Sequence, residues 1–105
     1  MTKCTHGTID GLSVRAACTG GTTWQVDASF TFTSDEDIRV PVTFTVLSAA
    51  RTRLVTLEKG VNTLEFNLQL DDPKRNNPFS FLGTDEAEAL IRIDGAEVSA
   101  PVSFA

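Results

Sequence analysis

The sequence has no tyrosine, a single histidine and only two cysteines among its 105 residues. A catalytic Ser-His-Asp or Cys-His group would therefore have to be built on His6. A blue-copper site needs two histidines beside a cysteine and is excluded. A zinc site would have Cys4, His6 and Cys18 as its only nitrogen and sulfur ligands. The acidic residues are neighbours in turns, unlike the facing carboxylates of a glycosidase. We therefore expect that the protein is not an enzyme.

Long apolar runs and an excess of basic residues are also missing. No run approaches the roughly 20 apolar residues of a membrane-spanning helix, so we expect no membrane span. Residues 1–6 lack the apolar stretch of a signal peptide, which fits a cytoplasmic protein or a chain whose leader has been removed. With 14 acidic and 9 basic residues the net charge is −5, which disfavours a nucleic-acid partner because phosphate binding needs clustered lysine and arginine. The length predicts one domain, residues 1–105.

What the sequence does contain is strict alternation of apolar and polar residues over 24–34. The apolar members are Trp24, Val26, Ala28, Phe30 and Phe32. Successive side chains of a strand point to opposite faces, so these residues would share one face of a sheet. Residues 38–46 repeat the pattern, and residues 34–37 between the two runs favour a turn. The two runs predict a pair of strands with a common apolar face.

The rest of the chain breaks into further short strands separated by turn residues. Asp-Gly pairs at 10–11 and 94–95 are the strongest short hairpin signals. Pro41 and Pro101 cannot donate to a ladder, which predicts edge strands or bulges at those positions. The only helical signal is a single turn that residues 83–88 could form. These features predict an all-β fold, an antiparallel β-sandwich of about 7–8 strands, immunoglobulin-like or jelly-roll-like.

The loop at 10–11 determines how the two cysteines would face each other. A two-residue loop places Cys4 opposite Ala17, whereas a three-residue loop with a bulge places Cys4 opposite Cys18. We favour the bulged loop and a Cys4–Cys18 disulfide. The alternative is two half-buried free thiols. A disulfide would favour an extracellular location, and without one the compartment stays open.

Acidic residues gather where two of the predicted turns fall. If every strand runs the length of the sandwich, successive turns lie at alternate ends, and the turns at 34–37 and 83–88 share one end. This places six candidate binding residues together: Asp35, Glu36, Asp37, Asp85, Glu86 and Glu88. Carboxylates in loops suit Ca²⁺, with Asp35, Asp37 and Asp85 as possible ligands, or a basic partner attracted by charge. The plainer alternative is a solvated rim that binds no cofactor.

Residues 57–73 resemble the immunoglobulin-like accessory domains of multidomain glycoside hydrolases. In those domains a strand, a Lys-Gly or similar turn and an alternating strand end before a proline, as at Lys59, Gly60 and Pro73 here. The tryptophan that often follows the proline is replaced by Lys74. The resemblance implies an immunoglobulin-like fold.

We therefore expect a non-catalytic binding or accessory module that recognises carbohydrate or a protein partner through loops at one end of the sandwich. The alternative is a structural or assembly subunit that associates through edge strands, such as those that contain Pro41 and Pro101. Ligand binding without self-association would favour the first function. A stable oligomer that binds no ligand would favour the second.

Overall fold

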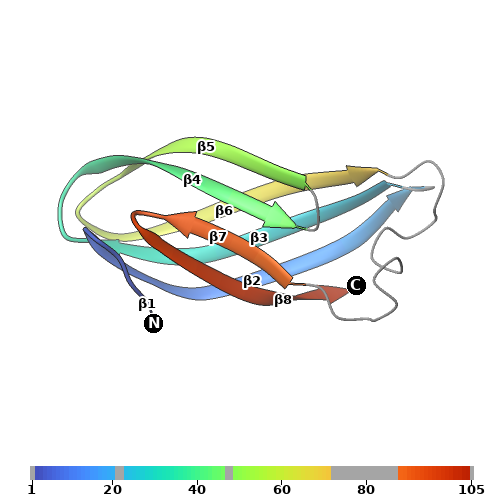
Figure 1. Cartoon of the computed structure of the whole chain (residues 1–105), viewed down its shortest axis with the longest axis horizontal. Coiled ribbons are helices and arrows are strands. Elements are labelled where there is room, and N and C mark those ends of the chain that lie inside the picture. The colour runs from blue at the N-terminus through green and yellow to red at the C-terminus, as the bar shows by residue number, and fades with distance from the viewer. Residues whose placement is uncertain (1, 21–22, 47–48, 72–87, 105) are drawn as a thin grey trace.

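The computed structural model describes residues 2–20, 23–46, 49–71 and 88–104, and every regular element within them is a β-strand (Figure 1). The all-β prediction is therefore confirmed for this part of the chain. No helix that is long and apolar enough to cross a membrane occurs among these residues. The strands are β1 (Thr2–Lys3), β2 (Gly7–Gly20), β3 (Thr23–Ser34), β4 (Ile38–Val46), β5 (Ala49–Leu57), β6 (Gly60–Asp71), β7 (Glu88–Ile93) and β8 (Ala96–Phe104).

The sheet is mixed and nearly barrel-shaped, which corrects the prediction of an antiparallel sandwich. Its strand order is β5-β4-β7-β8-β2-β3-β6, with β1 beside β2. All pairs of neighbours are antiparallel except β2 and β8, which run parallel. The sheet curls so that β4, β5 and β7 face β2, β3 and β6 across the core (Figure 1).

β8 changes partners along its length, and this explains the parallel pair. Residues 96–101 pair with β7, and residues 102–104 pair with β2. Pro101 ends the first ladder and Val102 begins the second, so Pro101 has a backbone neighbour on one side only. Pro41 pairs with Leu54 of β5, whereas the ladder of β4 with β7 begins at Val42. Both strands are interior, so the predicted edge position is wrong, because a proline needs only a local gap in one ladder.

The alternating stretch at 24–34 forms the centre of the core. Val26 and Phe32 are fully buried, and Phe30 is 2% exposed. The ring of Phe30 stacks on Phe66 of β6, with centroids 5.8 Å apart and planes 2° from parallel. Trp24 shares this face but is only partly buried, since it is the second residue of β3 and lies near the strand end.

The first Asp-Gly pair forms a bulge and not the predicted hairpin turn. Asp10 pairs with Thr31 and Ser13 pairs with Ser29, so β2 carries one more residue than β3 between these pairs. Gly11 has φ 69°, and its N–H is bonded to the Asp10 carboxylate at 2.9 Å. A bulge and a type I′ turn both need a residue with positive φ, so the dipeptide suits either.

The predicted Cys4–Cys18 disulfide is wrong, because Cys4 is a buried free thiol. With no turn at 10–11, β2 runs unbroken from Gly7 to Gly20. Cys4 lies just before the start of this strand, where its N–H is bonded to the Gly7 carbonyl at 2.7 Å. Cys18 pairs with Trp24 at the other end of β2, eleven residues from Gly7. At about 3.3 Å per strand residue this is a separation of more than 30 Å.

The inward face of β5 breaks the apolar pattern of the other strands. Arg51 and Arg53 alternate in phase with Val55 and Leu57, which are buried. Each arginine reaches across to β6. Arg51 donates to the backbone and side-chain oxygens of Asn67 at 3.2 and 2.9 Å. These charges in the inward phase interrupt the apolar alternation in the first half of β5, which begins at Ala49.

Arg53 and Asn62 complete this contact between β5 and β6. Arg53 donates to the Glu65 carbonyl at 3.1 Å, and its guanidinium carbon lies 4.3 Å from the Phe66 ring centroid. The Asn62 amide donates to the Glu58 and Gly60 carbonyls at 2.8 and 3.1 Å. We call this line of side chains between β5 and β6 the seam. No backbone ladder joins the described residues of the two strands, so side chains close the sheet there.

Candidate functional site

The predicted acidic cluster is divided between the two ends of the molecule. Asp35, Glu36 and Asp37 form the turn before β4, at the end where Ile38 begins that strand. Glu88 begins β7, which runs antiparallel to β4 with Ala89 opposite Val46, so Glu88 lies at the far end. The predicted grouping is therefore wrong for Glu88, because β6 ends and β7 begins at the same end. Asp85 and Glu86 lie outside the described residues.

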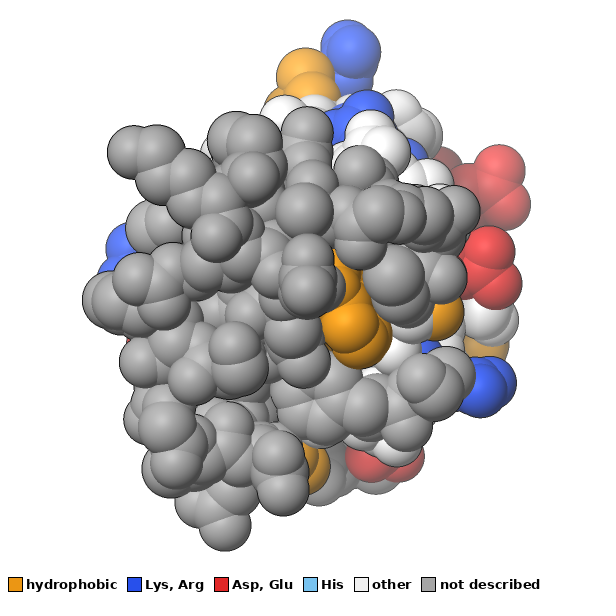
Figure 2. All heavy atoms as spheres, turned by 90° about the vertical axis from the view of Figure 1, so that its right-hand side faces the viewer, with side chains coloured by type: hydrophobic (Ala, Val, Ile, Leu, Met, Phe, Trp, Pro, Cys, Tyr) orange, Lys and Arg blue, Asp and Glu red, His pale blue; other side chains and the backbone are white. Residues whose placement is uncertain are grey.

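The three acids at 35–37 take part in contacts between turns. The Asp37 carboxylate accepts from the Lys59 N–H at 2.8 Å, and the Asp35 N–H donates to the His6 carbonyl at 2.8 Å. No three His, Cys, Asp or Glu side chains in the described part of the chain gather as a metal site. The calcium site that would include Asp85 stays a prediction. At the other end, described side chains of both charge signs lie around the rim (Figure 2).

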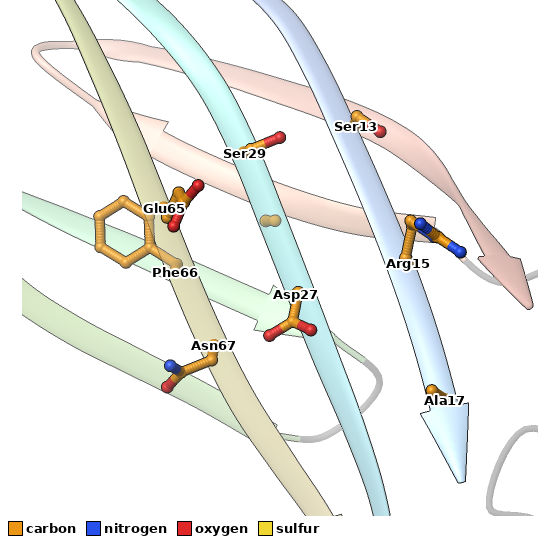
Figure 3. A pocket seen from close by; sticks show the side chains of 9 residues that line it. Ser13, Arg15, Ala17, Asp27, Ser29, Glu65, Phe66 and Asn67 are labelled. Atoms are coloured by element: carbon orange, nitrogen blue, oxygen red, sulfur yellow. The ribbon is translucent and has the colours of Figure 1, made fainter. Parts of the chain in front are cut away.

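A polar hollow lies instead on the outer face of β2, β3 and β6, and we call it the trough (Figure 3). It encloses about 470 Å³. Its walls and floor come mainly from the outward-pointing residues of the three strands. Ser13 pairs with Ser29, and because these side chains are small, the outer face of the sheet is recessed between the taller side chains around them. The trough is lined by Ser13, Arg15, Ala17, Asp27, Ala28, Ser29, Glu65, Phe66 and Asn67.

Strand pairing arranges the polar and charged side chains of the trough in rows across the three strands. Arg15 of β2 lies opposite Asp27 of β3, and Asp27 lies opposite Asn67 of β6. Ser29 lies opposite Glu65 in the next row. Figure 3 shows Arg15 on one side of the hollow and Glu65 and Asn67 on the other, with Asp27 between them. A ligand in the trough would therefore meet a guanidinium on one wall and carboxylates across from it.

Some of these polar groups are already bonded and others are not. The Gln25 amide donates to Asp27 Oδ1 at 3.1 Å, and Asn67 Oδ1 accepts from Arg51 at 2.9 Å. Within the described part of the chain, the side chains of Arg15 and Glu65 have no hydrogen bond or ion pair. These two charged groups are therefore available to a ligand.

The trough offers hydrogen bonds but little aromatic surface. Phe66 is its one aromatic residue. That residue is 3% exposed, and its ring is stacked on Phe30 and covered by the Arg53 guanidinium. Recognition there would depend on polar contacts and not on stacking against a ring.

The sequence did not identify any trough residue as a site. Alternation predicts that Asp27 points outward, but only the pairing of β3 with both β2 and β6 brings it beside Arg15 and Asn67. The one usable signal is the cluster of small outward residues, Ser13 and Ala17 on β2 and Ser29 on β3. A second hollow of about 480 Å³ lies over β4 and the β7–β8 turn, beside Pro41 and Gly95.

No family model and no curated protein matches this chain. Among solved structures it is similar to the Pseudomonas fluorescens alkylpurine DNA glycosylase bound to DNA containing an abasic site analog, with 12% identity and a TM-score of 0.52 over 93% of this chain and 30% of that chain. This likeness concerns the fold alone.

Two β-glucosidases also show a looser likeness. A GH3 enzyme from Bifidobacterium adolescentis has 23% identity and a TM-score of 0.38 over 91% of this chain and 17% of that chain. An enzyme from Erythrobacter marinus has 15% identity and a TM-score of 0.44 over 94% of this chain and 15% of that chain. The chain thus spans less than a third of each of the three proteins.

Proposed function

We propose that the chain is a non-catalytic binding module that holds a carbohydrate in the trough across β2, β3 and β6. The observation that carries this proposal is the trough itself, a hollow of about 470 Å³ whose Arg15 and Glu65 side chains have no bond within the described chain. This volume falls in the range of small-molecule sites, about 300–1,000 Å³.

The chemistry of the trough suits sugar hydroxyls. A hydroxyl both donates and accepts, so it can bond a carboxylate on one side and a guanidinium on the other. Neighbouring strands are about 4.8 Å apart, which spaces Arg15, Asp27 and Asn67 so that adjacent hydroxyls of one ring could each reach a partner. Because the groups stand on paired strands, their backbone positions are already fixed before binding.

Two features favour binding over catalysis. The chain's only histidine, His6, lies at the end of the molecule with Asp94 and is not part of the trough. The trough is an open face with carboxylates from neighbouring strands, whereas a glycosidase places its two carboxyl groups on opposite sides of the scissile bond.

Assembly through edge strands has less support. The strands that contain Pro41 and Pro101 are interior. The two end strands of the sheet, β5 and β6, face each other across the seam. There Arg51 and Arg53 donate hydrogen bonds to backbone carbonyls of β6 that a partner strand would need as acceptors. Charged side chains of this kind are a common means of preventing edge pairing.

A glycan array followed by calorimetric titration of the glycans that bind would test the proposal. We expect Arg15→Gln and Glu65→Gln each to weaken binding about tenfold, the effect of losing one charged hydrogen bond. Arg39→Gln and Glu58→Gln are matched controls outside the trough and should leave affinity unchanged. If no glycan binds, or if the trough variants bind as well as the controls, the proposed site is wrong. Sedimentation of the same samples distinguishes a non-binding monomer from an assembly subunit.

A further inference from the structure

The N-terminal segment, residues 2–6, is held to the rest of the molecule by a short ladder, by hydrogen bonds to two turns and by the burial of Cys4 in the core. β1 pairs with β2 through two residues, Thr2 opposite Ile9 and Lys3 opposite Thr8. Beyond that, the Thr5 N–H donates to the backbone carbonyl of Asp94 at 3.0 Å. A two-residue strand has little stability of its own, so the attachment of this segment depends on the contacts at its other end.

His6 supplies those contacts by joining two turns. Its backbone N–H and its Nδ1 both bond the Asp94 carboxylate, the ring contact being 2.7 Å, and its carbonyl accepts from the Asp35 N–H at 2.8 Å. Its Nε2 lies 3.8 Å from Glu36 Oε1. The Asp94 side chain is 4% exposed, and the His6 side chain is 43% exposed. His6 therefore links the segment to the β7–β8 turn and to the β3–β4 turn.

We propose that residues 2–6 form a pH-dependent clasp, in which protonated His6 holds the segment against Asp94 and Glu36, and loss of that proton loosens the segment and exposes the Cys4 thiol. The charged groups that face His6 are Asp94 from the β7–β8 turn and Asp35 and Glu36 from the β3–β4 turn, all of them acidic. The remaining titratable group nearby is Cys4 in the segment itself.

The direction of the effect follows from linkage. The hydrogen bond from the His6 ring to Asp94 raises the pKa of His6 above its usual 6.5, and the charges of Asp94, Glu36 and Asp35 add to this. A group whose pKa is raised in the docked state stabilises that state fully below its undocked pKa, and the stabilisation is lost as the pH rises through the docked pKa. The clasp is therefore tightest below the ordinary histidine pKa and loosens as the pH rises through the raised pKa of docked His6.

The reactivity of the Cys4 thiol can be used to measure this opening. The residue is 8% exposed, and burial raises the pKa of its thiol. Its Sγ contacts the Thr2 carbonyl at 3.9 Å, and the residue belongs to the buried apolar cluster, so the thiol is covered while the segment is docked against the core. When the segment leaves, the thiol meets solvent, whereas the core strands β3 and β4 stay in place.

The test is the rate at which 4,4′-dithiodipyridine modifies Cys4 between about pH 5.5 and about pH 8.5, a range that spans the titration of histidine. Peptide-level mass spectrometry separates Cys4 from Cys18 in the unaltered chain. Each rate is divided by that of the urea-unfolded protein at the same pH, which removes most of the effect of thiol ionisation. We expect the protection of Cys4 to fall several-fold as the pH rises, and to be low and independent of pH in His6→Gln and Asp94→Asn.

The proposal would be overturned by protection that does not change with pH in the unaltered protein, or by protection in His6→Gln that equals that of the unaltered protein at every pH. The urea midpoint is measured at each pH in parallel, because a loss of protection that only follows global unfolding also contradicts a local clasp. Asparagine tolerates positive φ, so Asp94→Asn keeps the turn in which residue 94 has φ 50°.

Discussion

Replacing Arg53 by alanine should destabilise the protein even though the side chain is exposed. Arg53 makes two contacts across the seam, one over the Phe66 ring at 4.3 Å and one with the Glu65 carbonyl at 3.1 Å. A cation–π contact at an exposed site is worth about 0.5–1 kcal/mol, and a net hydrogen bond about 0.5–1.5 kcal/mol. We therefore expect Arg53→Ala to lower the free energy of unfolding by about 1–2.5 kcal/mol.

Urea unfolding measures this change, and Arg39→Ala is the matched control. Arg39 is exposed on β4, and within the described residues it has no hydrogen bond or ion pair, so its loss should change stability by less than about 0.5 kcal/mol. Arg53→Lys keeps the charge but lacks the planar group that lies over the ring, and should recover only part of the loss. If Arg53→Ala and Arg39→Ala unfold at the same urea concentration, the seam contributes nothing and the reasoning fails.

The same seam predicts a change in association. In the double variant Arg51→Ala/Arg53→Ala the edge carbonyls of β6 lose their partners, and an unpaired edge is a template for another strand. We expect sedimentation velocity to show concentration-dependent self-association beyond that of the unaltered protein. A double variant that sediments as the unaltered protein does at every concentration would show that the arginines do not protect the edges.

Three further substitutions test the core and the backbone. Phe30→Ala should lower the free energy of unfolding by about 3–5 kcal/mol, because the ring is buried and stacked on Phe66; a thermal melt within a few degrees of the unaltered protein would contradict the assigned face of β3. At Gly7 an added Cβ would lie 2.1 Å from the Thr33 carbonyl oxygen, whereas at Gly11 nothing lies within 4 Å and only the φ of 69° opposes a side chain. Gly7→Ala should therefore prevent native pairing of β2 with β3. Gly11→Ala should lower the free energy of unfolding by only about 1–2 kcal/mol. Equal losses of stability for the two variants in urea unfolding would refute this contrast.

Features that depend on neighbours along the chain were predictable from the sequence. Alternation over 24–34 and 38–46 corresponds to β3 and β4, because single-face burial requires period-two spacing. The Asp-Gly pair at 94–95 forms the predicted turn, with φ values of 50° and 81°. Each of these outcomes is set by the local stereochemistry of a few consecutive residues.

The Asp-Gly pair at 10–11 shows where local information ends. Its glycine also has positive φ, but β3 continues to pair on both sides of it, so the backbone forms a bulge within one long strand. Whether a residue with positive φ reverses the chain or only bends it depends on the partner strand. That single difference places Cys4 and Cys18 at opposite ends of β2 and removes the expected disulfide.

The candidate sites were decided by tertiary structure for the same reason. The sequence indicates that Arg15, Asp27 and Asn67 point outward, but they become neighbours only because β3 lies between β2 and β6 in a particular register. His6 and Asp94, 88 residues apart in the chain, meet because the β7–β8 turn lies at the same end as the start of β2. Alternation determines which face a side chain occupies, whereas strand order and register, which the packing of the whole core selects, determine what lies beside it.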